Sequence, residues 1–194
     1  MRIIAFVGMP ASGKSRAAQL ARERDIPVVV MGDVIREEAK RCGLDQSDAN
    51  IGGLGDRLRA EEGMDAVAKR SVPMIRKLQK DTGLVVIDGI RGLAEVDLFR
   101  KEFGDDFMLI SIVAPIDIRL ERISRRERTD VVTDMDSLKA RDERELRWGM
   151  GEALESAAHV IRNTGTLDEF LGEVESVIDR MRRDLGEESS GECI

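Results

Sequence analysis

Short apolar runs alternate with longer amphipathic stretches along most of the chain. The apolar runs, which predict strands, cover residues 3–7, 26–31, 84–87, 107–113 and 157–161. Between them, apolar side chains recur at helical spacing over residues 15–24, 34–42, 56–80 and 93–103. Strands without polar alternation are typical of a parallel sheet that is covered on both faces. The pattern therefore predicts an α/β fold with a five-stranded parallel sheet between two layers of helices.

Three segments depart from this alternation. The glycine-rich residues 52–55 predict a flexible connection, and Gly63 and Pro73 are expected to bend the long helix that follows. Residues 166–169 match a capping box at the start of a last helix with a clear apolar stripe. The polar residues 186–194 behind that helix predict a flexible tail.

A phosphate-binding motif lies between the first predicted strand and the first predicted helix. It matches G-x-x-x-x-G-K-[ST] without a mismatch and reads Gly8-Met9-Pro10-Ala11-Ser12-Gly13-Lys14-Ser15. In such a loop, backbone N–H groups and the helix N-terminus bind the β-phosphate of a nucleotide. Lys14 adds a positive charge, and Ser15 offers a hydroxyl ligand for Mg²⁺. An incidental glycine turn is the alternative, but the strand, loop and helix follow in the order that nucleotide binding requires.

Polar residues also follow the other predicted strands. Asp33, Asp88, Arg91 and Asn163 come where the carboxyl ends of parallel strands meet, which is where such sheets bind nucleotides. Asp88 is placed as a Walker B aspartate, which holds Mg²⁺ opposite Ser15; a plain turn residue is the alternative. Motor ATPases of the AAA type commonly have glutamate next, whereas this chain has glycine. The base-recognition signatures of GTPases are absent as well, so transfer to a bound acceptor is favoured over hydrolysis.

Several of these segments resemble motifs of small-molecule kinases. The loop is similar to the G-x-P-G-x-G-K loop of adenylate kinases, with Ala11 in place of a glycine. Asp33-x-x-Arg36 resembles the acceptor-side motif of nucleotide, shikimate and dephospho-CoA kinases. Residues 88–91 resemble the D-G-F-P-R segment of adenylate kinases, without the proline. Over residues 1–184 the chain resembles an archaeal group of P-loop proteins related to adenylate kinase and dephospho-CoA kinase.

The resemblance implies a three-layer P-loop fold of the nucleotide-kinase type, with one domain at residues 1–185. An acceptor-binding insertion at about 32–80 and a helical lid at about 118–147 are then expected. Arg122 and Arg126 match the lid arginines that close over ATP in this class. A solvated, salt-bridged helix is the alternative, because acidic residues interleave with the lid arginines. These acidic residues are Glu121, Glu127, Asp130, Asp142, Glu143 and Glu145.

The resemblance also assigns expected roles to the residues at the strand ends. Asp33 orients or deprotonates a hydroxyl acceptor, although an N-cap of the following helix is a second interpretation. Arg36 and Arg91 bind phosphate on the acceptor, and the segment at Asn163 lines the adenine. ATP and Mg²⁺ are the implied cofactors. Dephospho-CoA is the leading acceptor and a nucleoside monophosphate the second.

Composition narrows the alternatives. The net charge of −7 and the few aromatic residues, with five Phe, one Trp and no Tyr, argue against nucleic acid as the main partner. No apolar run approaches the roughly 20 residues of a membrane span. Cys42 and Cys193 lack metal or redox spacing, which fits a reducing cytoplasm. Two rivals stay open: a slow regulatory ATPase, and a kinase acting on nucleic acid through its arginines.

Overall fold

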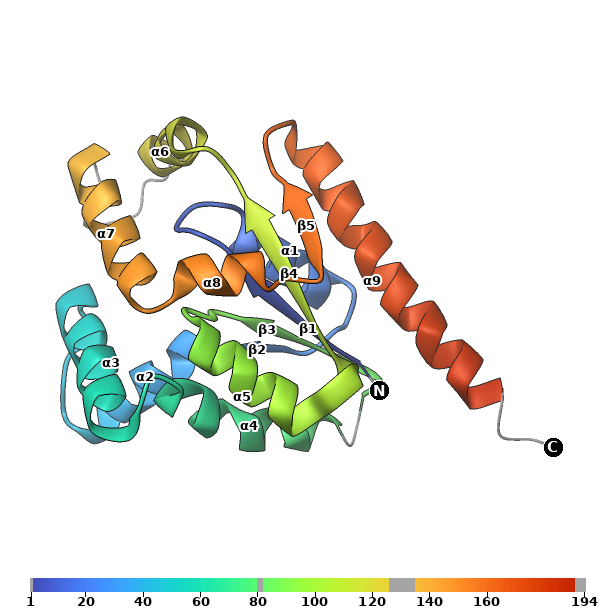
Figure 1. Cartoon of the computed structure of the whole chain (residues 1–194), viewed down its shortest axis with the longest axis horizontal. Coiled ribbons are helices and arrows are strands. Elements are labelled where there is room, and N and C mark those ends of the chain that lie inside the picture. Colours follow the sequence, from blue (N-terminus) through green and yellow to red (C-terminus); the bar gives the residue numbers. More distant parts are fainter. Residues whose placement is uncertain (1, 80–81, 126–134, 191–194) are drawn as a thin grey trace.

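The computed structural model describes residues 2–79, 82–125 and 135–190. Within them five strands form one sheet in the order β2-β3-β1-β4-β5, and every neighbouring pair is parallel (Figure 1). The strands are β1 (Arg2–Val7), β2 (Val28–Val30), β3 (Leu84–Asp88), β4 (Phe107–Val113) and β5 (His159–Arg162). Each predicted strand is present, and the predicted five-stranded α/β fold is confirmed.

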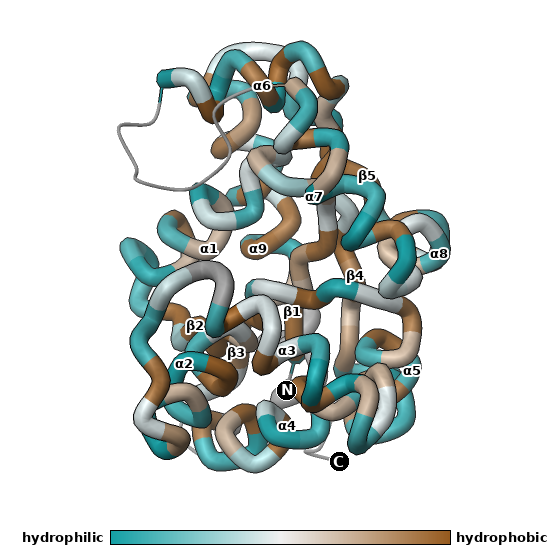
Figure 2. Tube along the Cα trace, turned by 90° about the vertical axis from the view of Figure 1, so that its left-hand side faces the viewer, coloured by the Kyte–Doolittle hydropathy of each residue, from teal (hydrophilic) through white to brown (hydrophobic). Residues whose placement is uncertain are grey.

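Helices cover both faces of this sheet. They are α1 (Lys14–Glu23), α2 (Met31–Arg41), α3 (Asp48–Glu62), α4 (Ala66–Gln79), α5 (Leu93–Phe103), α6 (Ile116–Ser124), α7 (Met135–Arg147), α8 (Met150–Glu155) and α9 (Leu167–Ser190), with a 3-10 turn η1 (Gly104–Asp106) before β4. Helices α1 and α9 pack on one face, and α4, α5 and α8 pack on the other. Figure 2 shows apolar and polar stretches alternating along these helices, as one-sided burial requires. No helix in the described part of the chain is long and apolar enough to cross a membrane.

Alternate side chains of β1 point into two separate cores. Ile4 and Phe6 pack with residues of α1 and α9. Ile3, Ala5 and Val7 pack with residues of α2, α3, α4, α5 and α8. All five side chains are almost fully buried, so β1 is the centre of the domain. The loop that follows β1 is therefore held by the most buried part of the fold.

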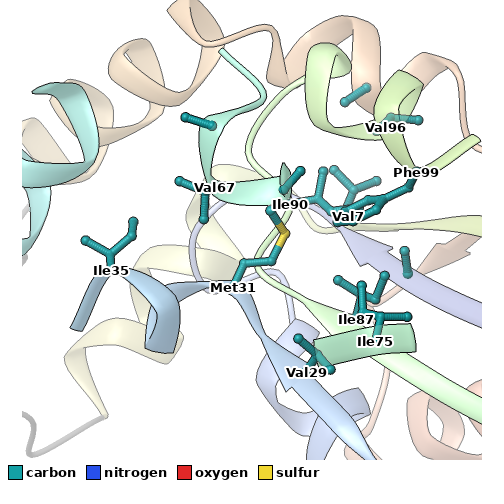
Figure 3. Close-up of a cluster of buried hydrophobic side chains, with 14 of the residues drawn as sticks. Val7, Val29, Met31, Ile35, Val67, Ile75, Ile87, Ile90, Val96 and Phe99 are labelled. Carbon is teal, nitrogen blue, oxygen red and sulfur yellow. The ribbon is translucent and has the colours of Figure 1, made fainter. Parts of the chain in front are cut away.

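The second strand passes into α2 without a connecting loop. Met31 is the first residue of α2, and its buried side chain lies among Val7, Val67 and Ile90 (Figure 3). The predicted strand included Met31, and the predicted helix began three residues later than the observed one. The difference arises because a buried methionine satisfies both an apolar strand pattern and an apolar helix face.

Three other sequence-based predictions are corrected. The glycine-rich residues 52–55 lie inside α3, where a Cβ at Gly52 or Gly53 would contact nothing within 4 Å. The predicted long helix is two helices, separated where Gly63 (φ +101°) follows α3; Pro73 lies within α4. Helix α9 continues to Ser190, so the first part of the predicted tail is helical. Helix α8 was not predicted.

Candidate nucleotide site

The phosphate loop and the predicted site residues lie at the carboxyl edge of the sheet. Phe6, near the end of β1, lies opposite Asp88 at the end of β3. Asn163, directly after β5, donates its backbone N–H to the carbonyl of Val113 at the end of β4, 2.9 Å away. Because parallel strands end at the same edge, the loop Gly8–Ser15 lies between these two segments. This is the edge at which α/β sheets bind ligands.

Close packing makes both glycines of the loop necessary. A Cβ at Gly8 would lie 2.4 Å from the carbonyl oxygen of Ile112, in the neighbouring strand. A Cβ at Gly13, whose φ is +125°, would lie 2.4 Å from Nδ2 of Asn163. Real Cβ atoms essentially never lie this close to another heavy atom. The backbone of the loop is thus held from both sides by β4 and by the segment after β5.

The loop ends in a helix that presents free backbone donors. Helix α1 has no side-chain cap at its N-terminus and no acidic residue in its first turn. The N–H of Arg16 already donates to the carbonyl of Gly13 at 2.9 Å, so the N–H groups of Lys14 and Ser15 are the ones that an anion can use. Ala11 has a φ of 60°, a left-handed conformation that costs a residue with a Cβ about 1 kcal/mol. The loop holds this conformation although alanine is less suited to it than glycine.

Lys14 is almost buried in the loop and surrounded by charges. Its side chain is 8% exposed, and Nζ donates to the carbonyls of Gly8 at 2.5 Å and Met9 at 3.1 Å. Burial, and after it the guanidinium of Arg91, lowers the pKa of Lys14 to about 8. Arg141 on α7 lowers the pKa too, whereas Glu145 and Asp88 oppose the shift. The pKa of Lys14 thus responds to two arginines and two carboxylates of other segments.

Oxygen donors suited to Mg²⁺ lie beside the loop. Ser15 is exposed in the first turn of α1, and Asp88 is half-buried between β1 and β2, opposite Phe6 and Val30. A hydroxyl and a carboxylate are hard oxygen ligands, as Mg²⁺ prefers. No cluster of three His, Cys, Asp or Glu suited to a metal occurs among the described residues. A magnesium ion here would therefore complete its shell with phosphate oxygens and water.

Arg119 of α6 connects the loop to α7. Its guanidinium donates to both carboxylate oxygens of Asp142 at 2.9 and 2.6 Å. It also donates to the carbonyls of Pro10 and Ala114, each at 3.2 Å. Both partners of the ion pair are largely buried. Arg119 was not predicted as a site residue, and it fixes the positions of α6 and α7 relative to the phosphate loop.

Arg122 and Asn163 support the loop from the side of β5. Arg122 donates to the backbone carbonyl of Asn163 at 3.0 Å, to its Oδ1 at 2.8 Å and to the carbonyl of Ser12 at 3.3 Å. Nδ2 of Asn163 donates to the same carbonyl of Ser12 at 2.8 Å. Both residues were predicted to contact the nucleotide, and in this structure their side chains hold the loop. Arg126, the second predicted lid arginine, lies outside the described residues.

The predicted acceptor-side pair lies at the end of β2. Asp33 and Arg36 form an ion pair of 2.5 Å on the exposed surface of α2. The N-cap of α2 is Val30, so Asp33 is the third helical residue and the interpretation as an N-cap is wrong. A carboxylate in the first turn nevertheless stabilises the helix through its dipole.

Arg91 belongs to a chain of buried ion pairs that sequence reasoning missed. Its Nη1 donates to Oε1 of Glu145 at 2.6 Å, and its backbone N–H donates to Oε2 of Glu95 at 2.6 Å. Glu95 is also paired with Arg59 of α3 at 3.2 Å, and burial raises its pKa. The guanidinium of Arg59 lies 4.7 Å from the ring centre of Trp148. Helix α3, the segment after β3 and α7 are thereby connected.

The burial of acidic residues on α7 corrects one alternative. Asp142 and Glu145 are buried, whereas Glu143 and Arg144 between them are exposed. The interpretation of the lid segment as a solvated helix is therefore wrong for Asp142 and Glu145. The spacing of three residues was a signal for one common face, but alternating charges do not reveal which face is buried.

Comparison with known proteins assigns the chain to a family. A family model described as an AAA domain matches residues 7–139. The UPF0200 protein of Methanosarcina acetivorans is 53% identical over 92% of this chain and 95% of its own length. The UPF0200/UPF0201 protein of Archaeoglobus fulgidus is 51% identical over 95% of this chain, which spans only 57% of that relative.

Several kinases, and a protein without a stated activity, are among the solved structures with the same fold. TT1252 from Thermus thermophilus has a TM-score of 0.65 at 19% identity, covering 92% of this chain and 97% of its own. A dephospho-CoA kinase from Campylobacter jejuni has a TM-score of 0.61 at 15% identity, covering 95% and 99%. A shikimate kinase from Acinetobacter baumannii has a TM-score of 0.56 at 14% identity, covering 95% and 94%. The chain belongs to the UPF0200 family of archaeal proteins and has the P-loop kinase fold.

Proposed function

We propose that this protein transfers the γ-phosphoryl group of ATP, in the presence of Mg²⁺, to a small-molecule acceptor. The observation that carries the proposal is the gathering of arginines around the phosphate loop that holds the buried Lys14. Arg119 of α6 binds the loop at Pro10 and α7 at Asp142. On α7, Glu145 pairs with Arg91 and Arg141. Phosphoryl transfer needs such a preorganised set of cations around the phosphates, because charge spreads over their oxygens in the transition state.

Each residue has a proposed role. Lys14 bridges the β- and γ-phosphates, and backbone N–H groups of the loop hold the β-phosphate. Ser15 and Asp88 hold Mg²⁺, which neutralises phosphate charge when it is bound. Asp33 orients the acceptor or accepts its proton, while Arg36 binds phosphate on the acceptor. The glycine after Asp88, where motor ATPases commonly have glutamate, supports transfer over hydrolysis.

The acceptor is proposed to carry a hydroxyl group, with dephospho-CoA as the leading candidate. Asp33 supports this choice, since a hydroxyl acceptor loses a proton and a phosphate acceptor does not. A dephospho-CoA kinase and shikimate kinases are among the proteins that share the fold. A nucleoside monophosphate is the second candidate, for which Arg36 and Arg91 would supply the pocket.

The test is transfer of label from γ-labelled ATP with Mg²⁺. The tubes contain dephospho-CoA, nucleosides, nucleoside monophosphates or no acceptor. We expect label in one acceptor, and a loss of at least about a hundredfold in the Lys14→Ala variant, because a preorganised charge is removed. If Lys14-dependent phosphate release is equal in every tube and no acceptor is labelled, the protein is a slow ATPase instead.

We further expect ATP binding to depend on pH through Lys14. Its pKa in the free protein is lowered to about 8. Bound phosphates favour the charged ammonium, so the pKa in the complex is higher. At pH values between these two pKa values, ATP binding takes up a proton. The affinity for ATP therefore falls as the pH rises, by as much as about tenfold per pH unit.

Calorimetry in buffers of different ionisation enthalpy measures this uptake. It should be small at pH 7 and approach one proton at pH 9. The Lys14→Met variant serves as the control and should show no such change. Equal proton uptake by the unmodified protein at both pH values would show that Lys14 is not the group that takes up the proton.

A further inference from the structure

Glu145 is an almost fully buried carboxylate near the phosphate loop, and it is incompletely paired. The residue is 1% exposed on α7. Its Oε1 accepts from Arg91 at 2.6 Å and lies 3.5 Å from Nε of Arg141. Its Oε2 is buried without a hydrogen-bond partner, and so is Nε of Arg141. One oxygen of the carboxylate thus faces two guanidinium groups. The other oxygen, and Nε of Arg141, could each still form a hydrogen bond.

Such a half-satisfied arrangement is costly in a protein interior. A buried polar atom without a partner loses its interaction with water and gains nothing in return. In native proteins such atoms call for an explanation, and a functional role is one of them. Helix α7, which carries Arg141 and Glu145, is tied to the phosphate loop by Arg119, which binds both Asp142 and the carbonyl of Pro10. A ligand that completes the bonding here would therefore bind next to the phosphate loop.

The two arginines are free to exchange partners. Their side chains are 27% and 32% exposed, for Arg91 and Arg141 respectively. The backbone of Arg91 is held separately, because its N–H donates to Glu95. The guanidinium can therefore turn while the main chain stays in place. Phosphate presents several oxygens, so a guanidinium can bind it with two parallel hydrogen bonds. Glu145 does not bind either guanidinium in this way here.

We propose that Glu145 is a positioning residue, an internal anion that holds Arg91 and Arg141 beside Lys14 until phosphate groups of a ligand take over both arginines. The inference rests on the proposed function only in requiring that phosphates bind beside Lys14. The negative charge of Glu145 offsets the repulsion among the three cations, Lys14, Arg91 and Arg141, in the free protein. The same charge competes with the ligand, so Glu145 sets how tightly phosphates are held.

The test replaces the carboxylate by an amide of the same size, Glu145→Gln. We measure binding of pyrophosphate by calorimetry and, where transfer is active, the kinetics with ATP. Removing the competing anion should tighten pyrophosphate binding about fivefold, the worth of one partly screened ion pair. The KM for ATP should fall without a rise in kcat. A purely structural role would predict a higher KM, a lower kcat and weaker binding.

Two further variants keep the test interpretable. Glu143→Gln removes an equal charge from an exposed position of the same helix and should leave pyrophosphate binding within about twofold of the original value. If Glu145→Gln does not fold, Arg91→Gln takes its place. Because it removes a phosphate partner, it should weaken pyrophosphate binding about tenfold or more.

The outcomes separate this inference from the proposed function. Pyrophosphate binding that is unchanged or weaker in folded Glu145→Gln would overturn the role of Glu145, whatever the enzymatic result. Unchanged binding in Arg91→Gln would overturn it as well. Tighter binding in Glu145→Gln, with no labelled acceptor for the unmodified protein, would keep this inference and remove the kinase proposal.

Discussion

Replacing Arg119 by alanine should lower the free energy of unfolding by about 3–5 kcal/mol, because it leaves the buried carboxylate of Asp142 without its partner. The guanidinium makes two hydrogen bonds to Asp142 and also binds the carbonyl of Pro10 in the phosphate loop. Loss of these contacts should also release α7 from the loop. Chemical denaturation measures the first effect, and nucleotide affinity reports the second.

A neighbouring arginine on the same segment gives the matched control. Arg125 pairs with Glu121 on the exposed surface, with side chains that are 78% and 59% exposed. Its replacement by alanine should change the stability by less than about 0.5 kcal/mol. The double variant of Arg119 and Asp142 to alanine should lose less than the sum of the single variants. Additive losses would show that the two side chains are not coupled.

Replacing Gly13 by alanine should lower nucleotide affinity by about a hundredfold, through displacement of the phosphate loop. The new Cβ would lie 2.4 Å from Nδ2 of Asn163 and 3.1 Å from the ring of Phe170, at a φ of +125°. We expect a loss of stability of about 2–3 kcal/mol, since strained backbone and a displaced hydrogen bond add together. Calorimetry with ATP and chemical denaturation measure the two effects.

Replacing Gly172 by alanine should instead raise the free energy of unfolding. Gly172 is exposed on α9, and a Cβ there would meet nothing within 4 Å. Alanine is the better helix former, so the stability should rise by about 0.5–1 kcal/mol with ATP affinity unchanged. An equal loss of affinity in both variants would show that the effect of Gly13→Ala is not local to the loop.

Most of the fold follows from the apolar pattern, because buried parallel strands are read directly from runs such as Phe107–Val113. That strand is observed with the predicted bounds. The pattern is less informative for helices near the sheet. Residues 52–55 are rich in glycine and still helical, since Leu54 is anchored in the core beside Ile35. Tertiary packing there outweighs the low helix propensity of glycine.

The site was predictable where a sequence motif determines the backbone conformation. It was not predictable where the role of a charged side chain depends on its burial. Lys14 and the loop around it lie where the motif requires. Asp33 and Arg36 share the predicted edge of the sheet, but they pair with each other on the surface. Glu95 and Glu145 carry no motif, and only their burial distinguishes them from the many solvated glutamates of the chain. Burial of single charges depends on contacts between distant segments, which periodicity does not encode.

The only tryptophan of the chain, Trp148, lies between α3 and α7. Arg59 of α3 lies 4.7 Å from the ring centre of Trp148, and Arg144 of α7 lies 5.6 Å from it. Indole emission responds to the polarity and mobility of its surroundings. Any ligand that separates or tightens these two helices therefore changes the ultraviolet fluorescence of the unlabelled protein. The architecture thus supplies an intrinsic optical signal with which substrates can be screened before their chemistry is known.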